Sequence, residues 1–334
     1  LRKAAGIEEE WLGDDASASY VYADTGWQNS ATFTDYDLVG SDREGTGIFA
    51  LDRVPVVDLV CMFSGSEGGD FGPVALFAAE RYCRTRNAIL LIDPPSHWDS
   101  VAAVRESCRE HGGSSPNVMV YYPRLESADD GDDAPLSALG AIAGGIAAED
   151  ARHGIAGALR GRSIGLRCRH RLPVSPDAAD CAVLEKAGVN ALRQIDPGHL
   201  DFSGLVTFVQ GAGIDTDWER LRKRRSALFI IDSIARGTRW AIFESNKPET
   251  WLEVTAQVER FLRELFEAGD LAGNSPKEAC YVMCARELNH VAEEDGGGIA
   301  NLGGRLTVIN SSFVDNTAGT AGVQTPASAI NMLA

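Results

Sequence analysis

The sequence is informative first for what it lacks. None of its 334 residues belongs to a run of about 18 apolar residues, so no membrane-spanning helix is expected. Its seven cysteines are odd in number and form no Cys-x-x-Cys pair, which favours reduced thiols over a disulfide framework. The 31 Lys and Arg residues are fewer than the 48 Asp and Glu residues. The resulting net charge of −17 disfavours nucleic acid or an anionic membrane surface as the main partner.

Signals of catalysis are also sparse. The six histidines form no His-x-x-x-His pair, and the glycine-rich loop at 65–69 has neither a P-loop ending nor dinucleotide-binding spacing. The sequence therefore predicts no metal site and no cofactor. Asp93 and His97 follow a predicted strand and have side chains suited to acid and base roles. An α/β hydrolase-like enzyme centred on this pair stays open as an alternative.

The periodicity of apolar residues indicates an α/β fold in the first half of the chain. Continuous apolar runs predict buried strands at 56–63, 88–92 and 117–122, and helical spacing predicts helices at 73–86, 99–111 and 138–151. Alternating strands and helices favour a mostly parallel sheet flanked by helices. The first 50 residues are polar, without a sustained period, and are interpreted as an irregular or edge segment.

The second half contains longer helices. Residues 152–180 are interpreted as a surface excursion, followed by helices at 178–187, 217–236 and 249–268 and strands at 189–195, 205–209 and 279–284. After Glu293 the composition shifts to glycine, asparagine, serine and threonine. We predict four regions: a polar segment 1–45, an α/β domain 46–187, a smaller α+β domain 188–290 and a C-terminal arm 291–334.

A cluster of cations opens the helix predicted at 217–236. It consists of Arg220, Arg222, Lys223, Arg224 and Arg225. Five cations repel one another, and the start of a helix prefers anions. Two interpretations remain open: a solvated face that pairs with acids such as Asp215 and Glu219, or an electropositive patch for an acidic partner.

Several segments carry a family resemblance. They include TGIFALDRVPVVDLVCM (46–62), ALFAAERYCRTRNAILLIDPP (75–95), MVYYPRL (119–125), AGVNALRQI (187–195) and a long block from Trp218 to Cys284. In this order, residues of about 36–285 resemble the tail sheath proteins of contractile phages, R-type pyocin-like particles and phage-derived contractile injection systems.

The resemblance implies a structural protein that is not an enzyme. It implies a subtilisin-like α/β domain without a catalytic triad, and a smaller C-terminal domain that faces an inner tube. Subunits of this family form stacked hexameric rings around the tube, meet baseplate and terminal cap proteins, and contract to drive the tube through a target envelope. The particle is a virion tail or a cytoplasmically assembled injection particle, without direct membrane or nucleic-acid contact.

Two kinds of assembly contact follow from the resemblance. The five cations become candidates for contact with the tube. Terminal arms exchanged between subunits make Leu306, Thr307, Val308 and Ile309 candidates for an inter-subunit strand.

The sequence departs from the family pattern at both ends. The segment before residue 36 is short for the family's N-terminal arm, and the tail does not match the family's closing strand. Instead, GGGIANLGGRLTVINSSFVDNTAG (296–319) resembles one rung of a parallel β-helix. A β-helix-containing surface protein is therefore a further alternative, although a solenoid needs about three rungs.

Overall fold

The chain divides into two compact units in a computed structural model. The model describes residues 34–63, 69–111, 114–126, 135–157, 164–168, 170–203, 205–210, 218–245, 247–284, 305–309 and 330–333. Unit 1 comprises Leu1–Gly145 and Ile164–Gln210, and unit 2 comprises Ile146–Ser163 and Gly211–Ala334. The sequence placed a boundary at residue 188, whereas the strand that follows it belongs to the sheet of unit 1.

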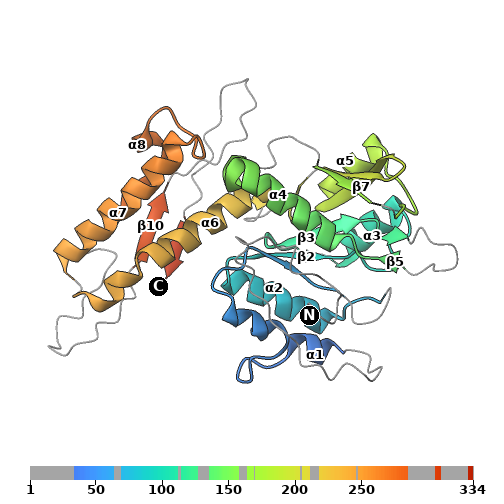
Figure 1. Cartoon of the computed structure of the whole chain (residues 1–334), viewed down its shortest axis with the longest axis horizontal. Coiled ribbons are helices and arrows are strands. Elements are labelled where there is room, and N and C mark those ends of the chain that lie inside the picture. The colour runs from blue at the N-terminus through green and yellow to red at the C-terminus, as the bar shows by residue number, and fades with distance from the viewer. Residues whose placement is uncertain are drawn as a thin grey trace, which may run out of the picture. The chain divides into compact units, whose positions relative to one another are not determined.

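A six-stranded sheet forms the centre of unit 1 (Figure 1). Its strands are β1 (Leu59–Cys61), β2 (Ile89–Ile92), β3 (Val118–Tyr122), β6 (Ile164–Arg167), β7 (Val189–Asp196) and β8 (His199–Ser203), in the order β1-β2-β3-β7-β8-β6. The first four run parallel, and β8 and β6 are added in antiparallel fashion. This confirms the prediction of a mostly parallel sheet flanked by helices.

Helices bury both faces of this sheet. The helices α2 (Pro73–Thr85), α3 (Val101–His111) and α5 (Ala178–Lys186) contribute Tyr82, Val104 and Leu184 to one core cluster. On the opposite face, α4 (Leu139–Gly157) places Gly145 against Phe202 and Ile164, where an added Cβ would lie 3.2 Å from both side chains. The boundary between the units falls within α4. A strand with both faces covered reads as a continuous apolar run, which is why β2 and β3 were predictable.

The prediction of a strand at 205–209 is wrong, because the structure forms no strand there. Leu205 has a positive φ of 40°, and the backbone of Val206 is bound by the side chain of Asn190 instead of a ladder. Asn190 Nδ2 donates to Val206 O over 2.8 Å, and Val206 N donates to Asn190 Oδ1 over 2.7 Å. The strand that follows β7 is β8, whose polar residues gave little apolar signal.

The segment before β1 is more regular than predicted. It forms α1 (Asp35–Val39) and the 3₁₀ helix η2 (Gly47–Arg53). The prediction of an irregular or edge segment is therefore wrong for these residues. The Asp35 carboxylate accepts a hydrogen bond from Gly72 N at the start of α2 over 3.0 Å. The Asp52 carboxylate accepts hydrogen bonds from Tyr82 and Arg86, each over 2.7 Å. These long-range bonds, which no local period reveals, order the segment.

Unit 2 is built from helices and a small sheet. Its elements are α6 (Leu221–Gly237), η4 (Arg239–Phe243), α7 (Pro248–Glu267), α8 (Pro276–Ala279), β9 (Tyr281–Met283), β10 (Arg305–Ile309) and β11 (Ile330–Leu333). Ile230 and Ile234 of α6 pack in one cluster with Val258 and Leu262 of α7. The three strands pair antiparallel in the order β11-β10-β9. Across the described residues, no helix combines the length and apolar character that crossing a bilayer requires.

Candidate functional site

The cationic cluster lies at the start of α6. Arg220 is exposed at the helix N-cap position, while Arg222, Lys223 and Arg224 are half-buried. Lys223 Nζ lies 5.9 Å from the centroid of the Trp218 ring, and Arg224 Cζ lies 5.0 Å from it. Both distances fall within the range of cation–π attraction, which offsets part of the repulsion between neighbouring cations.

Arg225 belongs to the interior of unit 2 instead of its surface. Its side chain is 5% exposed, and Nη1 and Nη2 donate to the two carboxylate oxygens of Asp150 on α4 over 2.9 and 2.5 Å. A guanidinium and a carboxylate bound in this bidentate manner satisfy each other's charge. No local sequence pattern indicates this pair, because its members lie 75 residues apart.

The predicted inter-subunit strand is a strand in the structure. Leu306, Thr307, Val308 and Ile309 lie in β10, which pairs with β11 on one side and β9 on the other. The register joins Thr307 to Met283 and Asn331. Exchange of these strands between subunits stays a prediction, and the β-helix rung that overlaps them lies mostly outside the described residues.

Asp93 and His97 face different partners. The Asp93 carboxylate accepts a hydrogen bond from Ser137 Oγ over 3.0 Å, whereas His97 Nε2 lies 3.4 Å from Ser107 Oγ and its ring lies edge-on to Trp98. Burial raises the pKa of Asp93, opposed by the Ser137 hydrogen bond and the charge of Arg124. No hydrogen bond or ion pair joins the two described side chains. The pair thus lacks the geometry of a coupled acid and base.

The chain also contains one Gly-x-Ser-x-Gly match, at 161–165. In hydrolases this pattern forms a turn in which the serine follows a strand and opens a helix. Here Ile164 and Gly165 open the strand β6, and Ser163 lies outside the described residues. The helix α4 precedes this match and the strand β6 follows it, whereas the hydrolase motif requires a strand first and then a helix.

A polar network ties together the loops at the carboxyl ends of β1, β2 and β3, where α/β enzymes usually bind ligands. Arg124 donates to Asp70 Oδ1 over 2.6 Å and to Pro94 O over 2.8 Å, and Ser96 Oγ donates to Asp70 Oδ2 over 2.7 Å. Burial alone would raise the pKa of Asp70, but the hydrogen bonds from Ser96 and the Arg124 charge lower it. The network thus makes three loops interdependent. Sequence reasoning missed it.

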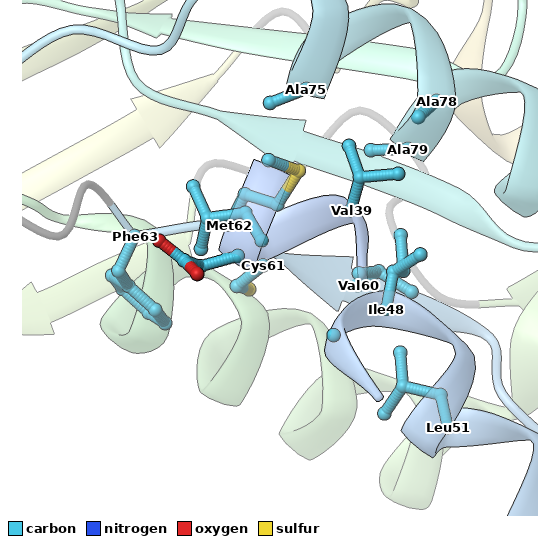
Figure 2. A pocket seen from close by; sticks show the side chains of 13 residues that line it. Val39, Ile48, Leu51, Val60, Cys61, Met62, Phe63, Ala75, Ala78 and Ala79 are labelled. Carbon is cyan, nitrogen blue, oxygen red and sulfur yellow. The ribbon is translucent and has the colours of Figure 1, made fainter. Parts of the chain in front are cut away.

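A cavity of about 340 Å³ opens beside β1, which we call the β1 cavity (Figure 2). Its lining comes from α1, η2, β1 and α2 and is mostly apolar, including Val39, Ile48, Val60, Phe63 and Ala78. Burial, with a further contribution from the Asp93 charge, raises the pKa of Cys61 in this lining to about 11. That thiol is protonated at neutral pH and is a poor nucleophile.

A second cavity, of about 310 Å³, lies within unit 2. Asp150, Phe229, Ile230 and Leu265 are among its lining residues. Within the described ranges of the chain, no three His, Cys, Asp or Glu side chains lie together in a way that could hold a metal ion.

Comparisons with known proteins point to contractile machines. No family profile and no curated protein matches the chain. A solved sheath complex of an extracellular contractile injection system (PVC) in its contracted state matches with a TM-score of 0.54 and 21% identity. The match covers 65% of this chain and 59% of that one, so the chain spans less than two thirds of that relative.

Two structures of the anti-feeding prophage (AFP) match over more of the chain. Its six-fold symmetrised baseplate gives a TM-score of 0.58 and 22% identity, covering 82% of this chain and 70% of that chain. Its contracted helical sheath gives 0.57 and 22%, with 82% and 71% covered. The chain therefore has the fold found in contractile sheath structures.

Proposed function

We propose that this chain is a structural subunit of a contractile sheath, which assembles as stacked hexameric rings around an inner tube and shortens to drive the tube through a target envelope. The observation that carries the proposal is the fold match to the contracted AFP sheath over 82% of the chain. A match of that extent exceeds either unit alone, so it favours a shared subunit architecture over a widespread α/β domain.

The chemistry of the described residues agrees with a structural role. Asp93 and His97 bind separate partners, and Cys61 carries a protonated thiol. The carboxyl ends of the parallel strands, where an α/β enzyme would bind substrate, are joined by the Arg124 network. Side chains that bind one another in this way stabilise loops and leave few groups to bind a substrate.

Four cations are the candidates for contact with the tube. Arg220, Arg222, Lys223 and Arg224 remain at or near the surface of α6, while Arg225 pairs with Asp150. An acidic tube would attract them through contacts of about 1 kcal/mol or less each, which salt weakens. Six subunits per ring would multiply such contacts enough to set the register, while each contact would break easily during contraction.

Strand exchange is the proposed link between subunits. In a single chain, β10 and β11 complete the ladder of β9. The same register formed with strands of a neighbouring copy would keep every backbone hydrogen bond and join the two subunits. Deletion of residues 296–334 is then expected to leave unit 1 folded but to prevent polymerisation.

Electron microscopy of the purified chain tests the function. We expect hollow tubes of stacked six-subunit rings, and two lengths of sheath when an inner tube protein is co-expressed. A chain that stays monomeric at every concentration, with or without the tube, would overturn the proposal.

Charge reversal tests the tube contact separately. Changing Arg220, Arg222, Lys223 and Arg224 to Glu should leave empty sheath polymers intact but abolish assembly on the tube. Reversal of Arg105 and Arg109, two exposed cations of α3, is the matched control and should have no such effect.

A further inference from the structure

The outer edge of the unit 1 sheet is open among the described residues. β1 is the first strand in the order of the sheet, and there it pairs only with β2. Asp58 O accepts a hydrogen bond from β2 and Met62 N donates one to it, so every second residue of this stretch faces β2. The backbone groups of Leu59 and Cys61 therefore point to the opposite side. A row of such groups at a sheet edge can pair with an added strand.

The β1 cavity extends along this open edge. Its lining includes four consecutive residues, Val60, Cys61, Met62 and Phe63 (Figure 2). Because successive side chains of a strand point to opposite faces, a cavity lined by all four must run along the edge of the strand. The cavity measures about 340 Å³, and a cavity of ~150 Å³ already holds a benzene-sized ring. The edge of β1 therefore offers both backbone groups and space for two aromatic rings.

One stretch outside the described residues has the composition of an occupant for this cavity. At 16–33, four of eighteen residues are aromatic, against 7% in the whole chain, and Asp24 is the one charged side chain. Solvated tails are usually rich in charge and poor in aromatic residues, so this composition favours burial. The other stretches of unit 1 outside the described residues lie at 64–68, 112–113, 127–134, 169 and 204, and they contain no large apolar side chain.

The position of this stretch along the chain favours the same contact. Thr34 is the N-cap of α1, and α1 supplies part of the cavity lining. Tyr22 lies twelve residues before Thr34, a distance that an extended chain spans over up to ~40 Å. Gly26 and the polar residues that follow it allow the chain to turn back. A segment tethered at the wall of a cavity has an effective concentration on the order of millimolar, which a free partner would have to match.

Within this stretch, residues 20–22 have the sequence of a short strand, Tyr-Val-Tyr. Aromatic and β-branched residues are the types that strands favour. In a strand, Tyr20 and Tyr22 point to one face and Val21 to the other, so the two rings enter the cavity together. A tyrosine has an apolar ring and a polar tip, which suits a mostly apolar cavity that opens to solvent.

We propose that residues 20–22 pair with the open edge of β1 as a seventh strand of the sheet, and that Tyr20 and Tyr22 fill the β1 cavity of the same molecule. The inference goes beyond the sheath role and does not depend on it. The added strand satisfies the outward backbone groups of Leu59 and Cys61, and the two rings cover the apolar lining. A closed edge also keeps β1 from pairing with other chains.

Cross-linking within one molecule tests the contact. The full-length chain carries Ala23→Cys, beside the proposed strand, and Ala78→Cys, in the cavity lining. A short bismaleimide is added at a concentration at which the chain is monomeric, and we expect linked peptides that contain positions 23 and 78. Ala102→Cys, on the exposed face of α3, replaces Ala78→Cys as the control. It should give at least about tenfold less linkage, because it lies outside the contact.

Isotope labelling identifies the molecule that supplies the strand. In an equal mixture of labelled and unlabelled chains, both linked peptides should carry the same label, because the contact lies within one molecule. Pairs with one labelled and one unlabelled peptide would show that a second copy is the occupant, and the proposal would be wrong. Linkage to position 78 that is no stronger than linkage to position 102 would also overturn it.

Hydrogen exchange provides a readout at the strand itself. Tyr20→Ser combined with Tyr22→Ser should speed exchange of the Leu59 and Cys61 amides by about tenfold or more, because both amides lose their partner strand. Equal exchange rates in the unchanged chain and in the tyrosine variant would contradict the added strand.

A matched variant uses the same segment. Trp11→Ser combined with Leu12→Ser removes two apolar side chains from its acidic part and should leave both exchange rates unchanged. Faster exchange in this control or in Trp27→Ser, without a change in the tyrosine variant, would mean that another part of the segment is bound and would refute the assignment.

These measurements use the monomeric chain, so they test the strand contact independently of tube formation. If the contact is not found but tubes form, this inference is wrong and the sheath proposal stands. If the contact is found but no tubes form, the sheath proposal fails and the added strand stands.

Discussion

The two units hold their charged groups in different ways. In unit 1, Arg124 and Asp70 belong to a network of loops at the sheet edge, and Asp70 is 37% exposed to water. In unit 2, Arg225 and Asp150 form a bidentate pair in which the guanidinium is almost fully buried. In the unit 1 network only Asp70 is well exposed, since the Arg124 side chain is 11% exposed. Water can replace a lost partner at an exposed charge, whereas a buried charge has no substitute partner. Removal of one partner of the buried Arg225–Asp150 pair should therefore destabilise the chain more than removal of one partner of an exposed pair.

Removing Asp150 should have the largest effect. Asp150→Ala leaves the Arg225 guanidinium buried without its counter-ion, and such losses cost about 3–5 kcal/mol. Chemical denaturation should show the loss. The double change Asp150→Leu with Arg225→Met should recover most of it. A matched control is Glu106→Ala, which breaks the exposed pair with Arg109 and should cost about 0–1 kcal/mol. Equal losses of stability for Asp150→Ala and Glu106→Ala would refute the contrast between the buried ion pair of unit 2 and the exposed ion pair of unit 1.

The apolar core of unit 2 provides a second test. Leu262 on α7 is fully buried in the α6–α7 cluster, so Leu262→Ala should cost about 2–5 kcal/mol in thermal or chemical unfolding. Leu252 on the same helix is 70% exposed. The same substitution there should change stability by about 0.5 kcal/mol or less. A large loss of stability for Leu252→Ala in the isolated subunit would contradict the exposed position of the Leu252 side chain.

In unit 1, the contact between Asp35 and Gly72 should give a smaller effect. A Cβ at Gly72 would lie 1.9 Å from Asp35 Oδ2, so Gly72→Ala must displace the carboxylate that binds the start of α2. Loss of such a helix cap costs about 0.5–2 kcal/mol. Asp35→Ala combined with Gly72→Ala should cost less than the sum of the two single changes, measured by denaturation. Additive costs would show that the two residues do not contact.

The smallest effects concern pH, where two carboxyl groups of unit 1 should behave oppositely. The lowered pKa of Asp70 means that its stabilising contribution is present above the unfolded pKa of ~3.9 and disappears as the pH falls. The raised pKa of Asp93 means that its contribution is present at low pH and is lost as the pH rises through the folded value.

Denaturation at pH 3–7 of two amide variants separates these signs. Asp70→Asn should be destabilising near pH 7, and the difference from the unchanged chain should shrink as the pH falls below about 4. Asp93→Asn should gain stability relative to the unchanged chain as the pH rises from about 4 to 7. Parallel pH profiles for both variants would contradict the opposite environments of the two groups.

The parts of the fold that the sequence predicted are those with a strong local pattern. β2 and β3 are continuous apolar runs, and α2 and α7 carry apolar residues at helical spacing, so each was placed within one or two residues. The misplaced strand at 205–209 has equally apolar residues. Within it, the backbone of Val206 is bound by the side chain of Asn190, 16 residues away, and Phe208 forms only an isolated bridge with Ser115. Neither arrangement leaves a local period to detect.

For the candidate sites, too, local sequence patterns were predictable and long-range contacts were not. A cluster of five cations is visible in the sequence, but Arg225 differs from its neighbours only because Asp150 lies within reach in three dimensions. Likewise, the walls of the β1 cavity come from four separate segments. Local composition predicted the cationic surface, and it could not predict which member was buried or where a cavity would form.

The placement of Trp218 has a consequence for observing the molecule at work. Lys223 and Arg224 both lie over its ring, and the field of nearby cations affects the light that an indole emits. An acidic surface that drew those cations away would change the emission wavelength without any added dye. The chain thus carries an intrinsic optical reporter beside its proposed tube contact, and stopped-flow fluorescence could follow the release of a tube in real time.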